Sequence, residues 1–265
     1  MSRRGILNIT SRKKKDSMRA YALTDFTTPV AGPYLVSGSF GLTVLGWIAT
    51  ARDNDTANPL TTPGTIFQSA TRTASTCFIR GLREEVEFRT SSGLAWQHRR
   101  IVFMFQGNDI IGVNGAVLPL WLLNSNGFQR GMFSLTSSNA GATSVFDNMQ
   151  TLLFEGRLGV DWNNFLTAPL DRNRIDVKYD STHVIKSGNE HGTMQKKKYW
   201  HGVNKNLVYD DDEVGDITAE NLLSARTKKS CGDMYVIDII VPGIGATASD
   251  LLQFDPESTL YWHER

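Results

Sequence analysis

Alternating apolar and charged positions give the clearest structural signal in the chain. Within residues 81–105, Leu82, Val86 and Phe88 fall on one face of an extended segment, and charged residues fall on the other. A second alternating run follows residues 91–93, the turn-forming sequence Ser-Ser-Gly. The short loop between the two runs predicts a hairpin of adjacent strands.

Strand patterns recur elsewhere, and helical patterns are scarce. Further strands are predicted in residues 34–50, 173–186, 198–209, 233–241 and 258–264. Their separators are rich in Gly, Pro, Asn, Ser and Thr, which favour turns. Short helices are predicted for residues 144–154 and 217–225, with Ser144 and Thr218 as N-caps. Many strands with long connections and few helices predict an all-β, single-domain sandwich or jelly roll, not an α/β enzyme.

Composition places the chain among ordinary globular proteins. Its 265 residues, 40% hydrophobic and 21% charged, are enough to bury a full core in one all-β domain. The longest nearly uncharged apolar run, residues 110–123, is too short to cross a bilayer, and no secretory signal is present. We therefore expect an intracellular protein without membrane contact. Two cysteines, Cys77 and Cys231, predict buried thiols and no disulfide framework or zinc site.

Positive charge is concentrated in the first 25 residues. Seven basic residues minus Asp16 and Asp25 give +5 there, which leaves −4 for the rest of a chain whose net charge is +1. A basic arm over residues 1–20 could neutralise phosphates by releasing counterions, or could act as a nuclear localisation signal. A solvated tail fits the same composition equally well. The basic residues are Arg3, Arg4, Arg12, Lys13, Lys14, Lys15 and Arg19.

A second basic run contains aromatic residues. Aromatic rings can stack on unpaired bases while neighbouring cations hold the backbone. The same pattern fits an edge strand whose rings face the core and whose lysines discourage pairing with another sheet, and we favour this structural interpretation. The residues of the run are Lys196, Lys197, Lys198, Tyr199 and Trp200.

The acidic run of residues 209–216 offers oxygen ligands for a hard cation such as Ca²⁺. Its acidic residues are consecutive, whereas an EF-hand loop spaces them at alternate positions. A solvated loop, or a partner for lysines of a neighbouring subunit, is therefore favoured, and we expect no bound metal or cofactor. The weak metal-ligand candidates are Asp210, Asp211, Asp212 and Glu213.

Motifs for catalysis are missing from the sequence. Residues 243–248 match G-x-G-x-x-A, but Pro242 precedes them and only 17 residues follow, too few for the rest of a dinucleotide-binding unit. We interpret this segment as a turn. The histidines form no H-E-x-x-H pattern and no G-x-S-x-G occurs. We therefore expect that the protein is not an enzyme.

Several segments, taken together, carry a family resemblance. In chain order they are ILNITSRKKKDSM, CFIRGLREEVEFRTSSGLAWQHRRIVF, VDWNNFLTAPLDRNRIDVKYD, NKNLVYDDDE and STLYWHER. They resemble the capsid proteins of genomoviruses (gemycircularvirus-like), which are circular single-stranded DNA viruses related to geminiviruses. The likeness extends over most of the chain, from residue 6 to residue 265.

The resemblance implies an eight-stranded antiparallel viral jelly roll over residues 21–265, preceded by the basic arm. It implies self-assembly of about 60 copies into a small T=1 icosahedral shell around circular single-stranded DNA. It further implies contact with the host nuclear import machinery, and location in the virion and the host nucleus. The segment SRKKKD matches the family's basic motif, so Arg12 to Lys15 are carried over for DNA contact and import, and Arg3 and Arg4 join them on charge.

The family's arm is generally longer and richer in arginine than the sequence that opens here as MSRRGIL. A shorter arm releases fewer counterions, so interior-surface groups such as Lys196 to Lys198 are expected to contribute. Subunit contacts are expected from aromatic residues in long connections, of which many could instead be core: Trp47, Trp121, Trp162 and Phe165. The alternative function is a monomeric β-barrel that binds single-stranded nucleic acid.

Overall fold

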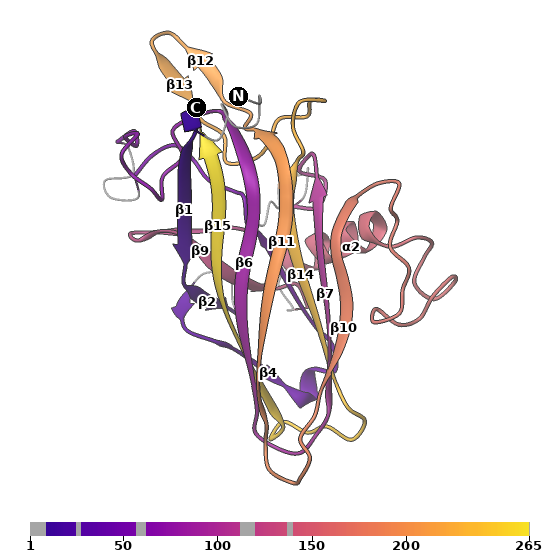
Figure 1. Cartoon of the computed structure of the whole chain (residues 1–265). Coiled ribbons are helices and arrows are strands. Elements are labelled where there is room, and N and C mark those ends of the chain that lie inside the picture. The colour runs from indigo at the N-terminus through magenta and orange to yellow at the C-terminus, as the bar shows by residue number, and fades with distance from the viewer. Residues whose placement is uncertain (1–8, 25–27, 57–61, 112–119, 137–139, 265) are drawn as a thin grey trace.

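The computed structural model describes residues 9–24, 28–56, 62–111, 120–136 and 140–264. They form a sandwich of two large sheets whose long strands run along the long axis of the molecule (Figure 1). Within these ranges, no helix is both long enough and apolar enough to span a membrane.

Sheet A has the strand order β1-β15-β6-β11, and every pair is antiparallel. Its strands alternate between buried and exposed residues, as expected for a sheet with one face against the core. A short strand, β4 (Tyr34–Ser37), pairs with the first residues of β15. The strands are β1 (Arg12–Met18), β15 (Leu251–Glu264), β6 (Thr76–Thr90) and β11 (Met194–Val208).

Sheet B has the order β10-β7-β14-β5-β9-β2-β3. Its central strands β7 and β14 are buried on both faces along most of their length. The small strand β8 (Leu122–Asn124) pairs with β9, and η1 (Gly38–Phe40) is a 3₁₀ turn before β5. The strands are β10 (Asp176–Ile185), β7 (Trp96–Phe105), β14 (Asp233–Pro242), β5 (Thr43–Ile48), β9 (Gly127–Ser134), β2 (Ala20–Leu23) and β3 (Val30–Ala31).

The order of the main strands is that of a jelly roll. The eight strands in chain order are β1, β5, β6, β7, β10, β11, β14 and β15. The first, eighth, third and sixth of them lie side by side in sheet A, and the fifth, fourth, seventh and second lie side by side in sheet B. Two interleaved four-stranded sheets of this kind define the jelly roll. The predicted all-β, single-domain jelly roll is confirmed.

The predicted hairpin of residues 81–105 is wrong. Strands β6 and β7 form where the alternation places them, but β6 pairs with β11 and β15, and β7 pairs with β10 and β14. The loop of residues 91–95 therefore carries the chain from one sheet to the other. Loop length did not decide the pairing, because β7 is buried on both faces in the middle of sheet B, its apolar residues by packing and its Arg99 and Arg100 by ion pairs with Asp180 and Glu84.

Both helix predictions need correction. Helix α2 (Ala140–Leu153) covers residues 144–153 of the predicted segment but begins before Ser144, so Ser144 is not its N-cap. Residues 217–225 form no helix: β13 (Ile217–Ala219) pairs with β12 (Asp212–Val214) in a small hairpin. The turn predicted for residues 243–248 is confirmed, since this segment connects β14 to β15.

A third layer covers one side of the sandwich. Buried side chains of α2 and the connection after it join one apolar cluster with the outer face of sheet B. Two further clusters fill the space between the sheets. The outer face of sheet A is left open among the described elements (Figure 1). The α2 layer contributes Val145, Met149, Leu153, Phe154, Trp162 and Phe165.

Candidate nucleic-acid interface

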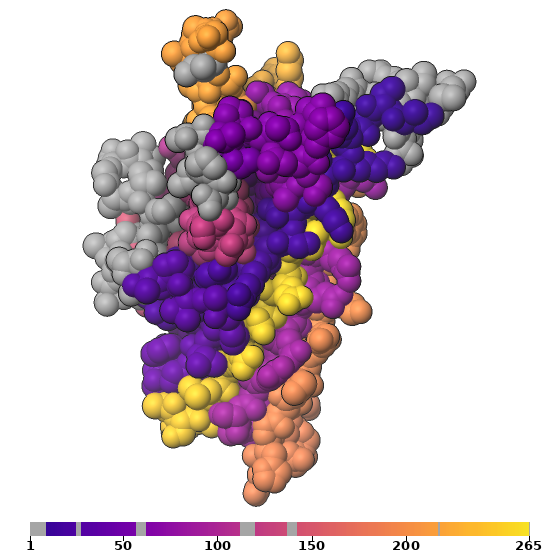
Figure 2. Space-filling model, turned by 90° about the vertical axis from the view of Figure 1, so that its left-hand side faces the viewer, coloured from indigo at the N-terminus to yellow at the C-terminus, as the bar shows by residue number. Residues whose placement is uncertain are grey.

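The basic run of residues 12–15 lies in a strand of the sandwich, where an arm up to residue 20 was expected. Strand β1 pairs with β15 from Arg12 opposite Glu264 to Met18 opposite Ser258. Figure 2 views the molecule from the side of β1 and shows the indigo beginning of the chain against its yellow end. Because successive side chains of a strand point to opposite faces, the run is divided between surface and interior.

Lys14 is the inward-facing member of this run, which corrects its expected role in DNA contact. Its side chain is 2% exposed, and its Nζ lies 3.0 Å from Glu264 Oε2 and donates to the carbonyl of Thr71 at 2.8 Å. Burial alone would raise the pKa of Glu264, but hydrogen bonds from Thr73, Trp262 and Lys14 lower it. The Lys14 ammonium is thus neutralised inside the subunit and holds β1 to β15.

The remaining basic residues of this region are exposed. Arg12 donates to the carbonyl of Ile66 at 3.1 Å, and its guanidinium carbon lies 5.5 Å from the ring centre of Phe67. Lys13, Lys15 and Arg19 face solvent. In the described part of the chain, none of these four cations forms an ion pair with a carboxylate. Arg3 and Arg4 lie outside the described residues.

The sheet register brings distant residues next to the exposed lysines. Lys13 stands opposite His263, which stands opposite Phe78 of β6. Lys15 stands opposite Tyr261. These residues belong to the start of β1, the end of β15 and the start of β6, which is the uppermost end of sheet A in Figure 1. We name the following group the basic-aromatic patch: Lys13, Lys15, Phe78, Arg80, Arg83, Trp200, Tyr261 and His263.

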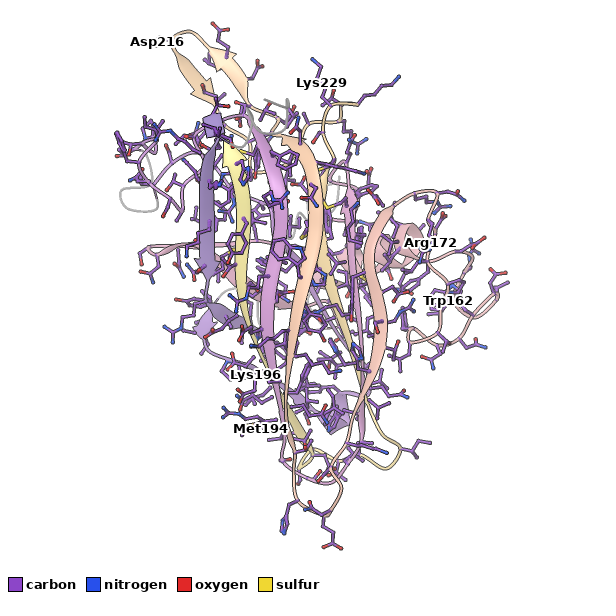
Figure 3. All side chains as sticks on the ribbon, viewed as in Figure 1. Trp162, Arg172, Met194, Lys196, Asp216 and Lys229 are labelled. Carbon is purple, nitrogen blue, oxygen red and sulfur yellow. The ribbon has the colours of Figure 1, made fainter. Side chains whose placement is uncertain are left out.

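The lower half of the same face carries charges of both signs. Lys196 Nζ lies 3.5 Å from Glu87 Oε2, and Lys198 Nζ lies 3.8 Å from Glu85 Oε1. Arg89 also forms an ion pair with Glu87. Figure 3 shows Lys196 low on β11, away from the upper end of the sheet. Two of the three lysines of the second basic run therefore already have acidic partners.

Strand β11 is an edge strand of sheet A, as the structural interpretation of the second basic run requires. Tyr199 points inward and is 8% exposed, with the Arg100 guanidinium carbon 4.6 Å from its ring centre. It cannot stack on a base in the folded subunit. Lys197 also points inward, and partial burial lowers its pKa. Trp200 points outward and is 53% exposed.

A buried charge cluster between the sheets was not predicted. Arg100 Nε donates to Asp238 Oδ1 at 2.7 Å, and Arg100 Nη1 donates to Glu84 Oε2 at 2.9 Å. Arg130 donates to the same two carboxylates, at 3.1 Å to Asp238 and 3.3 Å to Glu84. His98 Nε2 lies 2.7 Å from Asp238 Oδ1. All five side chains are 0–1% exposed.

The neighbouring charges set the protonation of this cluster. Burial would raise the pKa of both carboxylates, but the charges of Arg100 and Arg130 lower the pKa of Glu84, and Arg100 with His98 lowers that of Asp238. Burial lowers the pKa of His201, beside Glu84, to about 4. At neutral pH the cluster therefore balances two guanidinium groups with two carboxylates.

The acidic run does not gather into a metal site. Asp211 forms a two-pronged ion pair with Arg72, whose Nη1 lies 2.6 Å from Asp211 Oδ2. Asp212 and Glu213 are exposed in β12. Within the described ranges, no group of three or more His, Cys, Asp or Glu side chains is placed to hold an ion. Charge patterning also missed Arg72, whose partner lies 139 residues away.

No protein-family model matches the sequence, and no curated protein shows significant similarity to it. Among solved structures, the chain is similar to VP1 of Trichodysplasia spinulosa-associated polyomavirus in complex with GM1 oligosaccharide. The two are 9% identical, with 96% of this chain and 76% of that chain covered and a TM-score of 0.12. The unassembled Washington University polyomavirus VP1 pentamer is also 9% identical, with 100% and 96% covered and a TM-score of 0.12. Scores this low carry no weight, so the fold assignment rests on the strand order of this chain.

Proposed function

We propose that the protein is the coat protein of a virus of the genomovirus type. Many copies of the jelly-roll body assemble into a small icosahedral shell, and its cationic face packages circular single-stranded DNA. In this proposal the protein is a structural component of the virion and not an enzyme. The observation that carries the proposal is a jelly roll whose first strand exposes Arg12, Lys13 and Lys15, none of which is ion-paired with a carboxylate in the described part of the chain.

Packaging requires cations that the subunit itself does not neutralise. Each phosphate contact releases condensed counterions and gives affinity without sequence preference. Among the described residues, Lys13 and Lys15 meet this requirement on the outer face of sheet A, and Arg12 meets it at the start of β1. Sheet A is also the face that no other described element covers (Figure 1). We therefore expect this face to line the interior of the shell.

Assembly requires surfaces that bury apolar area between copies. Exposed apolar side chains gather at the lower end of the sandwich, where the Gly38 backbone N–H donates to the carbonyl of Asp250 and joins two loops. Clustered exposed apolar residues mark protein contact sites more often than isolated ones do. The residues concerned are Leu35, Phe40, Ile244 and Leu251. Of the aromatic residues considered for this role in the sequence, Trp47, Trp162 and Phe165 are buried in the core, and Trp121 is partly buried against it.

Nuclear import, the remaining part of the proposal, has to use residues that a receptor can reach. In the folded subunit, residues 12–18 are paired with β15 and Lys14 is buried. An import receptor would therefore bind the chain before β1 has docked, or would use Arg3 and Arg4. A fusion of residues 1–20 to a fluorescent protein tests this: nuclear accumulation that is lost on R3A/R4A supports the second route.

The decisive experiment measures particle mass and nucleic-acid content. Light scattering on purified protein should show megadalton particles, and negative-stain micrographs should show closed shells. The variant R12A/K13A/K15A, which keeps Lys14, should fold and assemble but contain little DNA. A chain that stays near its monomer mass of 29.5 kDa in all buffers would instead favour the monomeric nucleic-acid-binding module.

A further inference from the structure

The outer face of sheet A contains an aromatic platform in addition to its cations. Trp200 of β11 lies beside Tyr261 of β15, with ring centres 5.8 Å apart. Phe78 of β6 and His263 of β15 form a second pair at 6.0 Å. Trp200 is exposed, and Phe78, Tyr261 and His263 are half-buried, so the group leaves apolar ring surface in water that a partner could cover.

The sheet backbone holds the Trp200 indole close to its surface. A Cβ atom on Gly81 would meet Trp200 Cζ2 at 3.0 Å, and one on Gly202 would meet Trp200 Nε1 at 3.4 Å. The ring therefore lies across two glycines that face each other on β6 and β11. With one side against these glycines and 53% of the residue exposed, the ring is held in place before any ligand binds.

Cations adjoin these rings, and Glu85 lies at the lower border of the patch. The exposed acidic residues Asp212 and Glu213 belong to the β12–β13 hairpin, above the upper end of the sheet (Figure 1). Lys13, Lys15 and Arg80 form no ion pair within the described residues, while Arg83 is paired with Glu85 at the edge of the lower half. Burial lowers the pKa of His263, and the nearby charges of Arg80 and Lys13 lower it further. The patch thus combines cations with the exposed ring of Trp200 and the half-buried rings of Phe78, Tyr261 and His263.

We infer that the basic-aromatic patch is a binding surface for single-stranded polynucleotide, in which unpaired bases stack on Trp200 and Tyr261 and phosphates lie on Lys13, Lys15 and Arg80. The inference rests on the proposed function and adds residues and a binding mode to it. Stacking on every base type is possible, so binding is insensitive to sequence. Duplex DNA does not offer its ring faces, because its bases are stacked on each other.

The spacing of the patch suits an extended strand. Tyr261 and His263 stand two residues apart on β15, which is about 6.6 Å along the strand. Lys13 and Lys15, directly opposite them on β1, repeat the same spacing. One nucleotide can therefore place its base on a ring of β15 or β11 and its phosphate on a lysine of β1. The next nucleotide meets an equivalent ring and lysine about 6.6 Å further along the strands.

The test uses the full chain, fluorescently labelled oligothymidylate and salt titrations. Trp200→Ala should weaken binding about tenfold, the effect of losing one stacked base, and leave the salt dependence unchanged. Trp200→Phe should retain most of the affinity. K13A/K15A/R80A should lower the slope of log affinity against log salt by about 2, since three phosphate contacts are lost. Met194→Ala, an exposed apolar residue lower on the same strand, is the control and should change nothing.

Heparin and duplex DNA separate stacking from charge. Trp200→Ala should bind both as well as the parent chain does, because neither presents unpaired bases. The inference is overturned if Trp200→Ala and Tyr261→Ala leave oligothymidylate affinity within twofold of the parent. It is also overturned if they block assembly without changing that affinity, because a second copy of the chain would then cover the patch. Failure of the parent to form particles would instead count against the proposed function, since the binding assay does not depend on assembly.

Discussion

The buried charge cluster between the sheets, called the interior cluster below, and the basic-aromatic patch both contain cationic side chains, but in opposite surroundings. Between the sheets, Arg100 and Arg130 are neutralised by Glu84 and Asp238 within hydrogen-bonding distance. On the outer face, Lys13, Lys15 and Arg80 have no such partners among the described residues. A cation with a matched carboxylate contributes to the fold, and one without it is available to an external anion.

Distance from water decides how much each arrangement contributes to stability. Glu84 and Ser258 belong to sheet A, and Arg100, Arg130 and Asp238 belong to sheet B, so the cluster fixes how one sheet sits on the other. Losing one partner there leaves a charge that has neither water nor a counterion. Losing an exposed lysine removes only a screened, long-range interaction.

Among the variants considered, removal of the Asp238 carboxylate from the interior cluster is expected to cause the largest loss of stability. Asp238→Asn leaves Arg100 and Arg130 with a single carboxylate between them. The expected loss in the free energy of unfolding is at the upper end of about 3–5 kcal/mol, the cost of breaking a buried ion pair. Urea unfolding followed by tryptophan fluorescence measures it. Asp255→Asn on the outer face is the matched control, and an equal loss there would refute the distinction.

Lys14 tests the same distinction between adjacent residues of one sequence run. Lys14→Ala should lower the free energy of unfolding by about 3 kcal/mol, because Glu264 is left buried without its cation. The loss is smaller than for Asp238 because Thr73 and Trp262 still donate to Glu264. Lys13→Ala, one position earlier, should leave the urea midpoint unchanged and weaken DNA binding instead. Similar behaviour of the two variants would mean that β1 is not docked as described.

The pH dependence of stability reports on the interior cluster. His201 titrates near 6.5 in the unfolded chain, whereas burial lowers its pKa to about 4 in the fold. Between these values the unfolded state binds more protons, so the free energy of unfolding falls as the pH falls. From pH 7 to pH 5 the expected loss is about 2 kcal/mol. Burial lowers the pKa of His98 as well, which acts in the same direction.

His201→Phe isolates this contribution. Neither ring nitrogen of His201 has a hydrogen-bond partner among the residues that the structure describes, and the ring stacks on Tyr199, so Phe should be tolerated at pH 7. The variant should lose less stability than the parent between pH 7 and pH 5 in urea unfolding. The comparison with the parent is needed because burial raises the pKa of Asp233, which opposes the histidines. Equal losses in both proteins would show that His201 is not the group that titrates.

Alternation along single strands could be predicted from the sequence, but pairing between strands could not. The period of two located β6, β7, β10, β14 and β15 and indicated an all-β fold. It could not show that β6 and β7 belong to different sheets, because both loop length and patterning also fit a hairpin. Sheet membership depends on contacts between residues far apart in the chain, such as those of β1 with β15.

The same limit applies to the candidate site. A run of basic residues marked β1, but the run gives no sign that Lys14 faces Glu264 across 250 positions of sequence. One signal for the interior cluster was present: Glu84 occupies the apolar side of the alternation that includes Leu82 and Val86. A lone carboxylate on a buried face requires a buried cation. The patch residues Tyr261 and His263 carried no such signal, because only the sheet register places them beside Lys13 and Lys15.

The lower half of sheet A's outer face offers the finest test of the comparison. Lys196 and Lys198 form ion pairs with Glu87 and Glu85, and these pairs should keep the two lysines from binding phosphate. Neutralising both carboxylates should therefore extend the cationic surface toward the lower half of the face. E85Q/E87Q should raise oligothymidylate affinity about threefold at low salt, an effect that screening removes at high salt. K196A/K198A in the parent should change the salt slope by less than half of the roughly 1.4 expected for K13A/K15A. An unchanged affinity of E85Q/E87Q would mean that the bound strand does not reach past Trp200, and that the position of a lysine on the face matters more than its partner.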